Sequence, residues 1–372
     1  MIEQTNTPKL RFPEFKNEWS YDLLSDVVTN KSKKFDPKKE EATKDIELDS
    51  IEQNTGRLLD TYISNDFTSQ KNKFKKGNVL YSKLRPYLNK YYYAIIDGVC
   101  SSEIWVLNTL NKDVLVNKFL YYFIQTNRFS SVTNKSAGSK MPRADWELVK
   151  NIRLYKGSIK EQEKIGYFFS KLDRHIELEE EKLELLEQQK KGYMQKIFSQ
   201  ELRFKDENGN SYPDWSIKKI EDISKVNKGF TPNTKNDKYW DELNENWLSI
   251  AGMTQKYLYK GNKGITEKGA SKHVKVDKDT LIMSFKLTLG KLAIVKEPIY
   301  TNEAICHFVW KESNVNTEYM YYYLNSINIS TFGAQAVKGV TLNNDAINSI
   351  IVKFPVIQEQ NKIAYFFNKL DK

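Results

Sequence analysis

The most regular hydrophobic pattern of the chain covers residues 159–198. Apolar side chains recur there at alternating steps of four and three, a heptad spacing that is typical of a helix packed against another helix. Glu179 and Lys190 are polar positions within this seam, and Gly166 and Gly192 are weak interruptions in a stretch without proline. The pattern predicts one continuous helix of about forty residues, roughly 60 Å long.

Shorter apolar segments before and after this helix predict mixed α and β structure. Residues 80–87, 91–96 and 103–108 are rich in aromatic or β-branched side chains and are bounded by turn residues, which favours strands. Residues 115–129 and 317–327 have apolar side chains at helical spacing. Each of these two helices has an aromatic stripe, for which we favour core packing over base stacking: Phe119, Tyr122 and Phe123, and Tyr319, Tyr322 and Tyr323.

The chain contains an internal duplication. The segment IKEQEKIGYFFSKLDR at residues 159–174 returns as IQEQNKIAYFFNKLDK at residues 357–372, with 11 of 16 positions identical. Weaker correspondences keep the same order, such as SSEI at Ser101 with TNEA at Thr301. A repeat of this kind indicates a tandem duplication of one globular block followed by one helix.

This duplication sets the expected organisation. The fold class is α+β, with two tandem mixed α/β domains separated by long helices. The predicted segments are a first domain, a first helix, a second domain and a shorter second helix, at residues 1–158, 159–201, 202–356 and 357–372.

The composition of the chain predicts an anionic binding partner. The chain has 58 Lys and Arg against 48 Asp and Glu, a formal net charge of +10, so nucleic acid is the leading candidate. A lysine-rich surface with no ligand is the alternative. No apolar run approaches the ~18 residues of a membrane helix, and the first residues lack a signal-peptide core, so a cytoplasmic location is expected.

The sequence offers no catalytic constellation. Cys100 and Cys306 are far apart, and three histidines leave little for a metal site or a catalytic triad. A phosphate-binding loop is absent, and no carboxylate after Pro213 and Asp214 is followed by the lysine that a nuclease motif of the Pro-Asp type requires. We therefore expect no catalysis by the chain alone, no metal and no cofactor.

Several motifs occur together in a characteristic order. They are LRFPEF at Leu10, SKLRPYL at Ser82, SSEIWVL at Ser101, LRFKDENGNSYPDW at Leu202, and the two E-Q-x-K-I helix openings. In this order the chain resembles the specificity subunit of type I restriction–modification systems over essentially its whole length. The resemblance implies two target recognition domains, each recognising one half of a split DNA site. It also implies two conserved spacer helices that pack as an antiparallel coiled coil.

The same resemblance implies the partners: double-stranded DNA, two modification (methyltransferase) subunits and a restriction (motor and nuclease) subunit, with no membrane. One departure concerns the second spacer, which covers sixteen residues here, whereas family members have two spacers of comparable length. Two alternatives remain from the residues alone: a coiled-coil scaffold or adaptor with incidental basic charge, and a stand-alone nuclease.

Candidate DNA contacts are sought on loops between the predicted strands, where Arg or Lys binds guanine, Asn or Gln binds adenine, and other polar groups hold phosphates. The candidates in the first block are Lys31, Lys33, Lys34, Lys83, Arg85, Tyr87, Lys140 and Arg143. Those in the second block are Lys286, Thr288, Lys291, Lys338, Thr341 and Asn343. A solvated surface charge is the alternative for any single lysine.

The helix seams give candidate partner contacts, because a long apolar stripe facing water promotes aggregation. These are Ile165, Phe169, Leu172, Ile176, Leu183, Leu186 and Ile197 in the first helix, and Ile363, Phe367 and Leu370 in the second. The opening turns of the first helix are expected to pair with the second helix. Residues 183–197 are expected to pack against a partner subunit, a second copy of the chain or a further helix.

Overall fold

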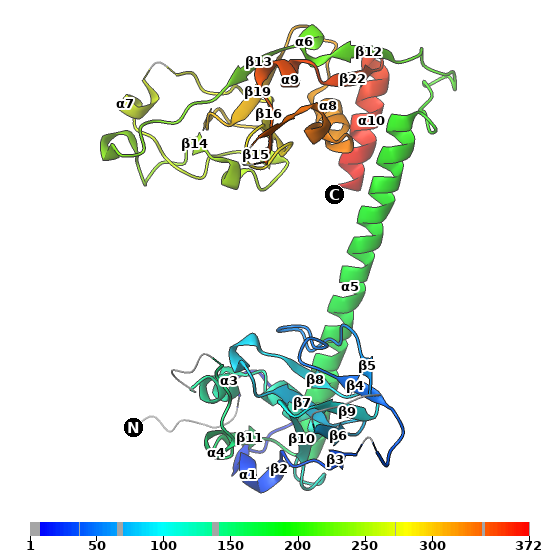
Figure 1. The fold of residues 1–372 in the computed structure, drawn as a ribbon, viewed down its shortest axis with the longest axis vertical. Coiled ribbons are helices and arrows are strands. Elements are labelled where there is room, and N and C mark those ends of the chain that lie inside the picture. The colour runs from blue at the N-terminus through cyan, green and yellow to red at the C-terminus, as the bar shows by residue number, and fades with distance from the viewer. Residues whose placement is uncertain are drawn as a thin grey trace. The chain divides into compact units, whose positions relative to one another are not determined.

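The chain forms two compact units, residues 1–180 and 181–372, in a computed structural model (Figure 1). The structure describes residues 8–36, 38–64, 70–135, 141–271, 273–336 and 339–371. Helix α5, Ile159–Ser199, is continuous over 41 residues and contributes its first part to the first unit and its last part to the second. The helix predicted from the heptad spacing is therefore confirmed, while the bounds of the four predicted segments stay a prediction.

The first unit is built around two antiparallel-rich sheets, of order β2-β10-β7-β8 and β3-β6-β9-β4-β5, with a separate β1-β11 pair. Its strands are β1 Ser20–Leu23, β2 Val28–Thr29, β3 Lys34–Phe35, β4 Lys44–Ile46, β5 Tyr62–Ile63, β6 Lys71–Phe74, β7 Val79–Ser82, β8 Tyr91–Tyr93, β9 Gly98–Ser101, β10 Ile104–Thr109 and β11 Arg153–Lys156. Its short helices are α1 Leu24–Val27, η1 Pro86–Leu88, α2 Asn117–Phe123, α3 Asn127–Thr133 and α4 Trp146–Val149.

The second unit has a five-stranded sheet of order β13-β19-β16-β17-β15 and three two-stranded pairs, β12-β22, β14-β18 and β20-β21. Its strands are β12 Ser216–Lys219, β13 Ser224–Lys228, β14 Trp247–Leu248, β15 Tyr257–Leu258, β16 Leu281–Ser284, β17 Leu292–Val295, β18 Tyr300–Thr301, β19 Ile305–Trp310, β20 Ala334–Ala336, β21 Gly339–Thr341 and β22 Ile351–Phe354. Its helices are α6 Ile220–Ile223, η2 Asp237–Tyr239, η3 Ile250–Gly252, α7 Glu267–Ala270, α8 Thr317–Ser326, η4 Ile329–Phe332, α9 Asn344–Asn348 and α10 Ile357–Leu370.

Local sequence explains where the predicted elements end. The strand predicted at 80–87 stops at Ser82, because Arg85 has a left-handed φ of 50° and Pro86 starts a 3-10 turn. The helix predicted at 115–129 is two helices, α2 and α3, and Thr126 lies between them with its hydroxyl donating to the Phe123 carbonyl at 2.7 Å. Both differences arise where a polar or ring-constrained residue gives the backbone a competing arrangement.

The aromatic stripes belong to the cores. Their six side chains are buried or half-buried and pack within the main hydrophobic cluster of each unit. Tyr81 and Phe129 meet edge to face at 5.1 Å in the first unit, and Phe198 and Tyr323 do so at 5.3 Å in the second. The preference for core packing over base stacking is therefore confirmed.

The duplication is also present in the hydrogen-bond register. Ser82 lies opposite Ile104 in the β7-β10 ladder, and Ser284 lies opposite Ile305 in the β16-β19 ladder. Ile104 and Ile305 have matching places in the two ladders and are 201 positions apart, whereas SSEI and TNEA align at an offset of 200. The hydrogen-bond register therefore shifts this correspondence by one residue. An offset by one residue changes which side chains are equivalent, since successive strand side chains point to opposite faces.

The repeated E-Q helix openings are structural clamps. Glu161, which is almost fully buried, accepts two hydrogen bonds from Arg11 at 2.6 and 2.7 Å, and buried Glu359 accepts two from Arg203 at 3.2 and 2.8 Å. A buried carboxylate needs such a partner, because an unpaired buried charge is strongly destabilising. The motifs that begin with Leu-Arg-Phe and the E-Q openings therefore fasten each block to its own helix.

The glutamine of each opening completes the clamp. Gln162 accepts from the Val116 amide at 3.0 Å, and Gln360 accepts from the Asn316 amide at 2.8 Å. Each side-chain amide also donates to two backbone carbonyls, those of Val114 and Gly157 in the first unit and of Asn314 and Pro355 in the second. The same set of an arginine, a glutamate and a glutamine thus makes the same local contacts in both units.

Within the second unit, α10 packs against the last turns of α5. Tyr193 contacts Phe366 at a ring-centroid distance of 5.2 Å, Phe198 stacks on Phe367 at 5.9 Å, and Lys190 pairs with Asp371. Lys190 lies early in this stretch of α5 whereas Asp371 follows the end of α10, so the two helical segments run antiparallel.

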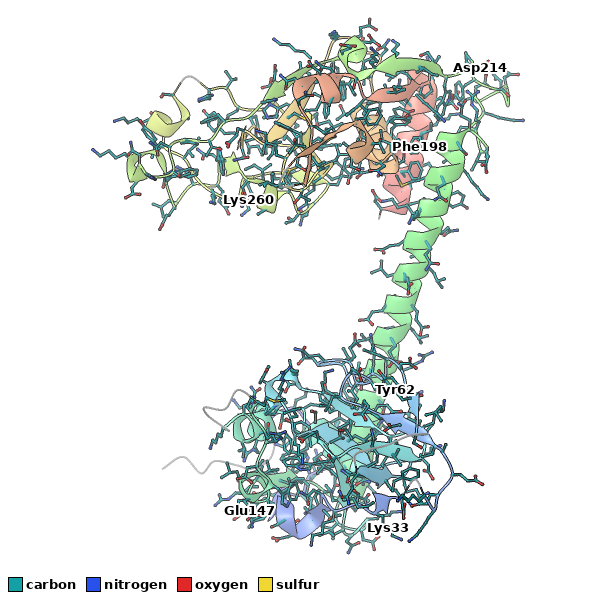
Figure 2. All side chains as sticks on the ribbon, in the orientation of Figure 1. Lys33, Tyr62, Glu147, Phe198, Asp214 and Lys260 are labelled. Carbon is teal, nitrogen blue, oxygen red and sulfur yellow. The ribbon has the colours of Figure 1, made fainter. Side chains whose placement is uncertain are left out.

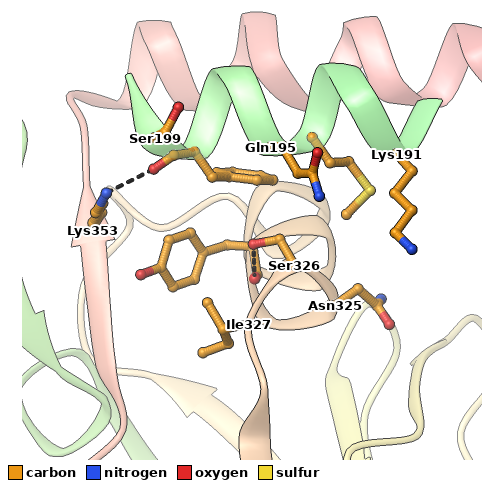
Figure 3. A pocket seen from close by; sticks show the side chains of 10 residues that line it. Lys191, Gln195, Ser199, Asn325, Ser326, Ile327 and Lys353 are labelled. Atoms are coloured by element: carbon orange, nitrogen blue, oxygen red, sulfur yellow. Dashed lines mark hydrogen bonds between the residues drawn. The ribbon is translucent and has the colours of Figure 1, made fainter. Parts of the chain in front are cut away.

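A pocket of about 480 Å³ lies beside this junction, between the end of α5 and α8 (Figure 3). Lys353 at its edge donates to the Phe198 carbonyl at 2.8 Å and so ties β22 to the last turn of α5. The Ser326 hydroxyl donates to the Tyr323 carbonyl at 2.6 Å. These bonds are used to hold helix ends, and the lining has no group of acids, bases and nucleophiles arranged for chemistry.

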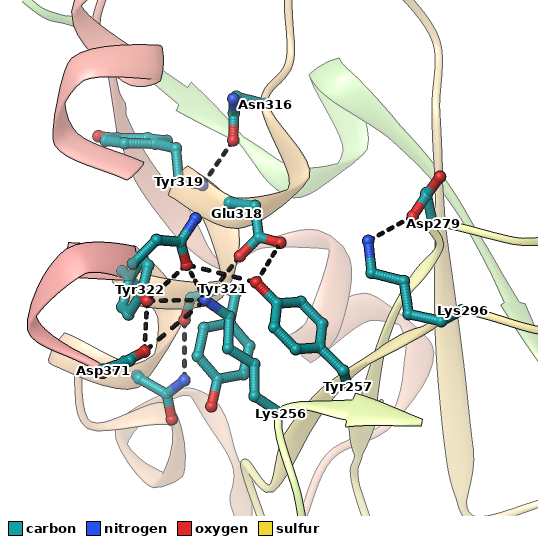
Figure 4. Close-up of polar contacts among 12 residues, drawn as sticks. Lys256, Tyr257, Asp279, Lys296, Asn316, Glu318, Tyr319, Tyr321, Tyr322 and Asp371 are labelled. Atoms are coloured by element: carbon teal, nitrogen blue, oxygen red, sulfur yellow. Dashed lines mark hydrogen bonds and ion pairs between the residues drawn. The ribbon is translucent and has the colours of Figure 1, made fainter. Parts of the chain in front are cut away.

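A polar network surrounds the end of α10 (Figure 4). The Lys256 ammonium lies 2.6 Å from Glu318 and 2.7 Å from the Tyr322 hydroxyl, and Tyr322 also bonds Asp371. Burial lowers the pKa of Lys256 and raises that of Tyr322. The first unit has a simpler counterpart, in which the Tyr122 hydroxyl donates to Asp173 at 2.8 Å.

Candidate nucleic-acid interface

The turn after β7 and the loop before α4 meet at one edge of the first unit. Leu84 and Arg143 form an isolated β-bridge, and the Arg85 amide donates to the Pro142 carbonyl at 2.8 Å. Arg85 is exposed and Tyr87 is 54% exposed. The structure therefore brings Arg143, which was nominated on one loop, to the turn with Lys83, Arg85 and Tyr87, which were nominated together on another.

Glu103 lies at the centre of this edge. Arg143 donates to it twice, from Nε at 3.1 Å and from Nη2 at 3.2 Å, and the Lys83 ammonium is 4.0 Å from the same carboxylate. The hydrogen bonds that Arg143 donates to Glu103 raise the pKa of Arg143, which remains a cation. The side chain of Arg143 is 50% exposed, against 25% for Glu103 and 28% for Lys83. We call these three residues the Glu103 cluster.

Glu103 was not nominated by sequence reasoning. Its motif, SSEIWVL, was noted, but an acidic residue beside a predicted DNA-contact loop is an unexpected choice when only charge is considered. The signal that points to it is positional, because it directly precedes buried β10, whose first residue faces the end of β7.

The predicted phosphate-binding lysines of the first block form an exposed segment around β3. Lys31, Lys33 and Lys34 are exposed, and Figure 2 shows Lys33 at the surface. Lys34 donates to the Asn72 side chain at 2.7 Å, and Asn72 in turn donates to the Ile104 carbonyl at 3.0 Å. This segment is thereby linked to the strand that follows Glu103. Lys140, like Lys338 of the second block, lies outside the described residues.

The second unit has an equivalent turn after β16. Leu287 has a left-handed φ of 66° and lies three positions after the end of β16. Arg85, which is also left-handed, lies three positions after the end of β7. Lys286 and Thr288 are exposed, Lys291 is half-buried, and the Ser284 hydroxyl accepts from the Lys291 amide at 3.0 Å.

The side chains at the equivalent positions are different. Backbone hydrogen bonds place Phe285, Ala304 and Thr341 where the first unit has the Glu103 cluster. Phe285 and Ala304 are buried and Thr341 is half-buried, so this edge has no charged cluster among those three positions. Asn343 accepts from the Ala346 amide at 2.8 Å and caps α9, which gives this candidate a structural role as well.

The seam residues divide into exposed and buried groups. Leu172, Ile176, Leu183 and Leu186 are between 41 and 58% exposed, Leu370 is 38% exposed, and Phe169 is 42% exposed with its ring 5.2 Å from that of Tyr122. Ile165 is half-buried against the core of the first unit.

Three seam predictions are wrong. Ile197, Ile363 and Phe367 are fully buried in the second unit's own core, so they present no surface to a separate chain. The physical reason is that α10 lies on the last turns of α5, and these side chains fill that junction. Ile363 and Phe367 are accordingly part of the second unit's own core.

Groups capable of catalysis are buried or scattered. The two thiols are buried, which raises their pKa values, that of Cys306 to about 12. Burial lowers the pKa of His307 to about 4, and its ring contacts the Thr301 hydroxyl at 2.5 Å. Within the described part of the chain, no three or more His, Cys, Asp and Glu residues gather as a metal site, and no helix is long and apolar enough to cross a membrane.

Known proteins resemble this chain along its length. The family model for the type I restriction modification DNA specificity domain matches twice, over residues 16–188 and 212–372. The MjaIX specificity subunit of Methanocaldococcus jannaschii is 30% identical over 183 residues, which cover 47% of this chain and 42% of that subunit. The chain thus spans less than half of that relative.

Longer but weaker likenesses extend over nearly the whole chain. The HindI specificity subunit of Haemophilus influenzae is 20% identical over an alignment that covers 95% of this chain and 92% of that subunit. A chain from a solved structure on complex assembly and conformational transition of the type I restriction–modification system aligns with a TM-score of 0.61 at 14% identity, covering 98% and 92% of the two chains, which shows a shared fold. With a repeated block, a repeated helix opening and two matches to one family model, this chain belongs to the type I restriction–modification DNA specificity family.

Proposed function

We propose that this chain is the sequence-recognition subunit of a type I restriction–modification complex, and that each unit binds one half of a bipartite, asymmetric DNA site. One observation carries the proposal. The two units repeat the same backbone frame, from the strand register to the left-handed residue after β7 and β16, yet carry different side chains on the turns that this frame presents. A common frame with divergent exposed residues suits two recognition modules of different sequence preference.

The predicted DNA contacts lie on these turns. In the first unit they are centred on Lys83, Arg85, Tyr87 and Arg143, with the exposed lysines around β3 as phosphate contacts. In the second unit they are centred on Lys286, Thr288, Lys291, Thr341 and Asn343. The frame supports this proposal because it gathers four nominated residues of the first block at one edge: Lys83, Arg85, Tyr87 and Arg143.

The helices are the proposed assembly surface. The exposed seam side chains of α5, from Leu172 to Leu186, are apolar and remain uncovered by their own units. We propose that they complete an antiparallel coiled coil and dock two modification subunits, with a restriction subunit joining the complex. The chain itself supplies recognition, and its partners methylate or cleave the DNA.

The decisive experiment is to map methylated positions in a genome that expresses this chain with its modification subunits. The expected result is one site with two specific parts, different in sequence and separated by unspecified base pairs. A short continuous site or a palindromic one would contradict the proposal of two independent recognition units.

A binding experiment separates DNA recognition from the scaffold alternative. The logarithm of the binding constant of the purified chain for duplex DNA should fall linearly with the logarithm of salt concentration, because phosphate contacts release counterions. A helical scaffold makes no such contacts, so salt-independent association, or none, would favour the scaffold.

A further inference from the structure

We propose that Glu103 determines specificity in the first unit by holding Arg143 in the orientation that binds guanine, so that the half-site of this unit contains a G·C pair read at the Glu103 cluster. The inference rests on the proposed DNA recognition and deepens it by naming the residue pair and the base.

The geometry of the pair fixes the guanidinium plane. Arg143 bonds the Glu103 carboxylate through two of its nitrogens, Nε and Nη2, at 3.1 and 3.2 Å. Such fork-like pairing restrains both the position and the plane of the guanidinium. The backbone is fixed as well, because Arg143 bridges Leu84 and the next amide, of Ala144, donates to the Lys83 carbonyl at 2.8 Å.

Among the described residues, the side-chain partner of the Arg143 guanidinium is Glu103, and this pairing leaves the opposite edge of the guanidinium for a ligand. Of five N–H donors, the two bonds to Glu103 leave three, which belong to Nη1 and Nη2. Two donors on one edge match the O6 and N7 acceptors of guanine in the major groove. Arg143 is 50% exposed, so this edge is accessible from outside.

The charges argue against a simple phosphate contact. Lys83 and Arg143 are two cations, and the Glu103 carboxylate beside them cancels half of their charge. A negative group next to a phosphate-binding site weakens it. A carboxylate that orients an arginine is useful where direction matters, and direction matters for a base edge more than for a phosphate.

The second unit provides an internal comparison. Phe285, Ala304 and Thr341 replace the three members of the cluster on an equivalent backbone frame. Recognition of guanine by this mechanism therefore belongs to the first half-site alone, and changing the cluster should leave the second half-site untouched.

The test is a selection of duplexes from a randomised pool by the purified full chain, followed by sequencing of the bound fraction. Wild-type protein should select a bipartite motif with a guanine in one half. Arg143→Lys keeps the charge but loses the fork, so preference for that guanine should fall at least roughly tenfold while the salt slope stays the same.

Glu103→Gln should act with a different signature. Removing the negative charge should increase binding to unrelated DNA, while the orientation of Arg143 is lost and the guanine preference falls. The double variant should be no less selective than Arg143→Lys alone, since the two residues act as one unit. A purely structural ion pair would produce neither the rise in nonspecific binding nor this non-additivity.

Matched controls come from the same unit. Asp97→Asn removes the carboxylate of an exposed pair with Lys75, whose ions are 2.7 Å apart, and Arg153→Lys changes an exposed arginine that stacks over Tyr21. Both controls should select the wild-type motif.

The outcomes are separable. If wild-type protein selects no motif, the proposed DNA recognition itself is wrong, and this inference fails with it. If wild-type protein selects a motif and both cluster variants select the same one, the Glu103 cluster is only a surface ion pair. If Arg143→Lys weakens all sequences alike, Arg143 is a phosphate contact and the inference is overturned.

Discussion

The two units differ most clearly where a lysine meets a pair of tyrosines beside the repeated helix. In the first unit Lys118, on α2, lies 5.9 Å from the ring centroid of Tyr122. In the second unit the corresponding helix position is Glu318, and Lys256 from a distant loop lies 4.1 Å from the ring of Tyr322. The tyrosine and its carboxylate partner are kept, whereas the source of the cation is not.

This difference teaches which parts of the repeat are constrained. Buried hydrogen bonds, such as the clamps at Glu161 and Glu359, recur with the same donors and acceptors. Charges at the periphery vary, because a partly exposed cation costs little to relocate as long as its partner moves with it. A duplicated frame can therefore diverge in ligand recognition without loss of its fold.

The largest expected effect tests whether the clamps are equally important in both units. Arg203→Ala would leave the fully buried Glu359 without its cation, and we expect the second unit to lose roughly 3–5 kcal/mol of unfolding free energy. Urea unfolding, followed by hydrogen exchange within each unit, measures this loss. The control Lys260→Ala removes an exposed pair with Glu245 and should change stability little.

Arg11→Ala makes the matching change in the first unit and should destabilise only that unit. If Arg203→Ala left the second unit as stable as the wild type, the clamp would not be a determinant of the fold.

Acid should distinguish the units next. His307 is buried in β19 and its pKa is lowered to about 4, below the value of about 6.5 in an unfolded chain. The neutral ring therefore stabilises the second unit above pH 6.5, and this contribution of up to roughly 3 kcal/mol is lost as the pH falls towards 4.

Hydrogen exchange of β19 compared with β10 between pH 7 and 4.5 measures this difference. His307→Gln should flatten the pH dependence of β19 and leave that of β10 unchanged. An equal loss of protection in both strands of the wild type would show that other groups dominate the acid response.

Assembly should depend on the exposed half of the seam. Leu183→Asp with Leu186→Asp places charges at positions that are 58 and 50% exposed, so the fold should persist while association with modification subunits weakens at least roughly tenfold, or ~1.4 kcal/mol. Leu185→Asp is the matched control, since Leu185 is 65% exposed but lies outside the seam. Equal assembly by the double variant and the control would remove this half of the helix from the interface.

The smallest effects are expected for the lysines around β3. Lys31→Ala and Lys33→Ala should weaken binding to all sequences alike and reduce the salt slope by about one unit each. Lys75→Ala, which removes an exposed lysine already paired with Asp97, is the control and should leave the slope unchanged. A change in the selected sequence would instead make either residue a base contact.

Sequence patterns predicted the helices and strands better than they predicted which segments pack against each other. The heptad spacing identified α5 within a few residues, and the duplication identified the two matching blocks. Spacing alone does not state what covers an apolar stripe, so Ile197 was assigned to a partner although the core of its own unit buries it. Contacts between α5 and α10 depend on where the second block places its helix, which local periodicity does not encode.

The candidate site could be predicted only in part, because it too depends on contacts between segments that are distant in the sequence. Basic residues on turns could be nominated from composition and turn chemistry, and Arg85 and Arg143 do share one edge. Glu103 required the register of β7 against β10, because only that pairing shows which side chain faces Arg143. The one-residue shift between SSEI and TNEA likewise follows from the strand register, which the amino-acid sequence alone does not show.

The clamps also govern the order in which the chain becomes folded during synthesis. Arg11 and Glu161 are separated by 150 positions and Arg203 and Glu359 by 156, so each clamp closes only after an entire block has been made. Contacts of such long sequence separation form slowly. The first block and both of its clamp residues have left the ribosome well before Glu359 is synthesised. The first block therefore has time to fold alone. In the second block, Arg203 lacks its partner Glu359 until α10 has been synthesised.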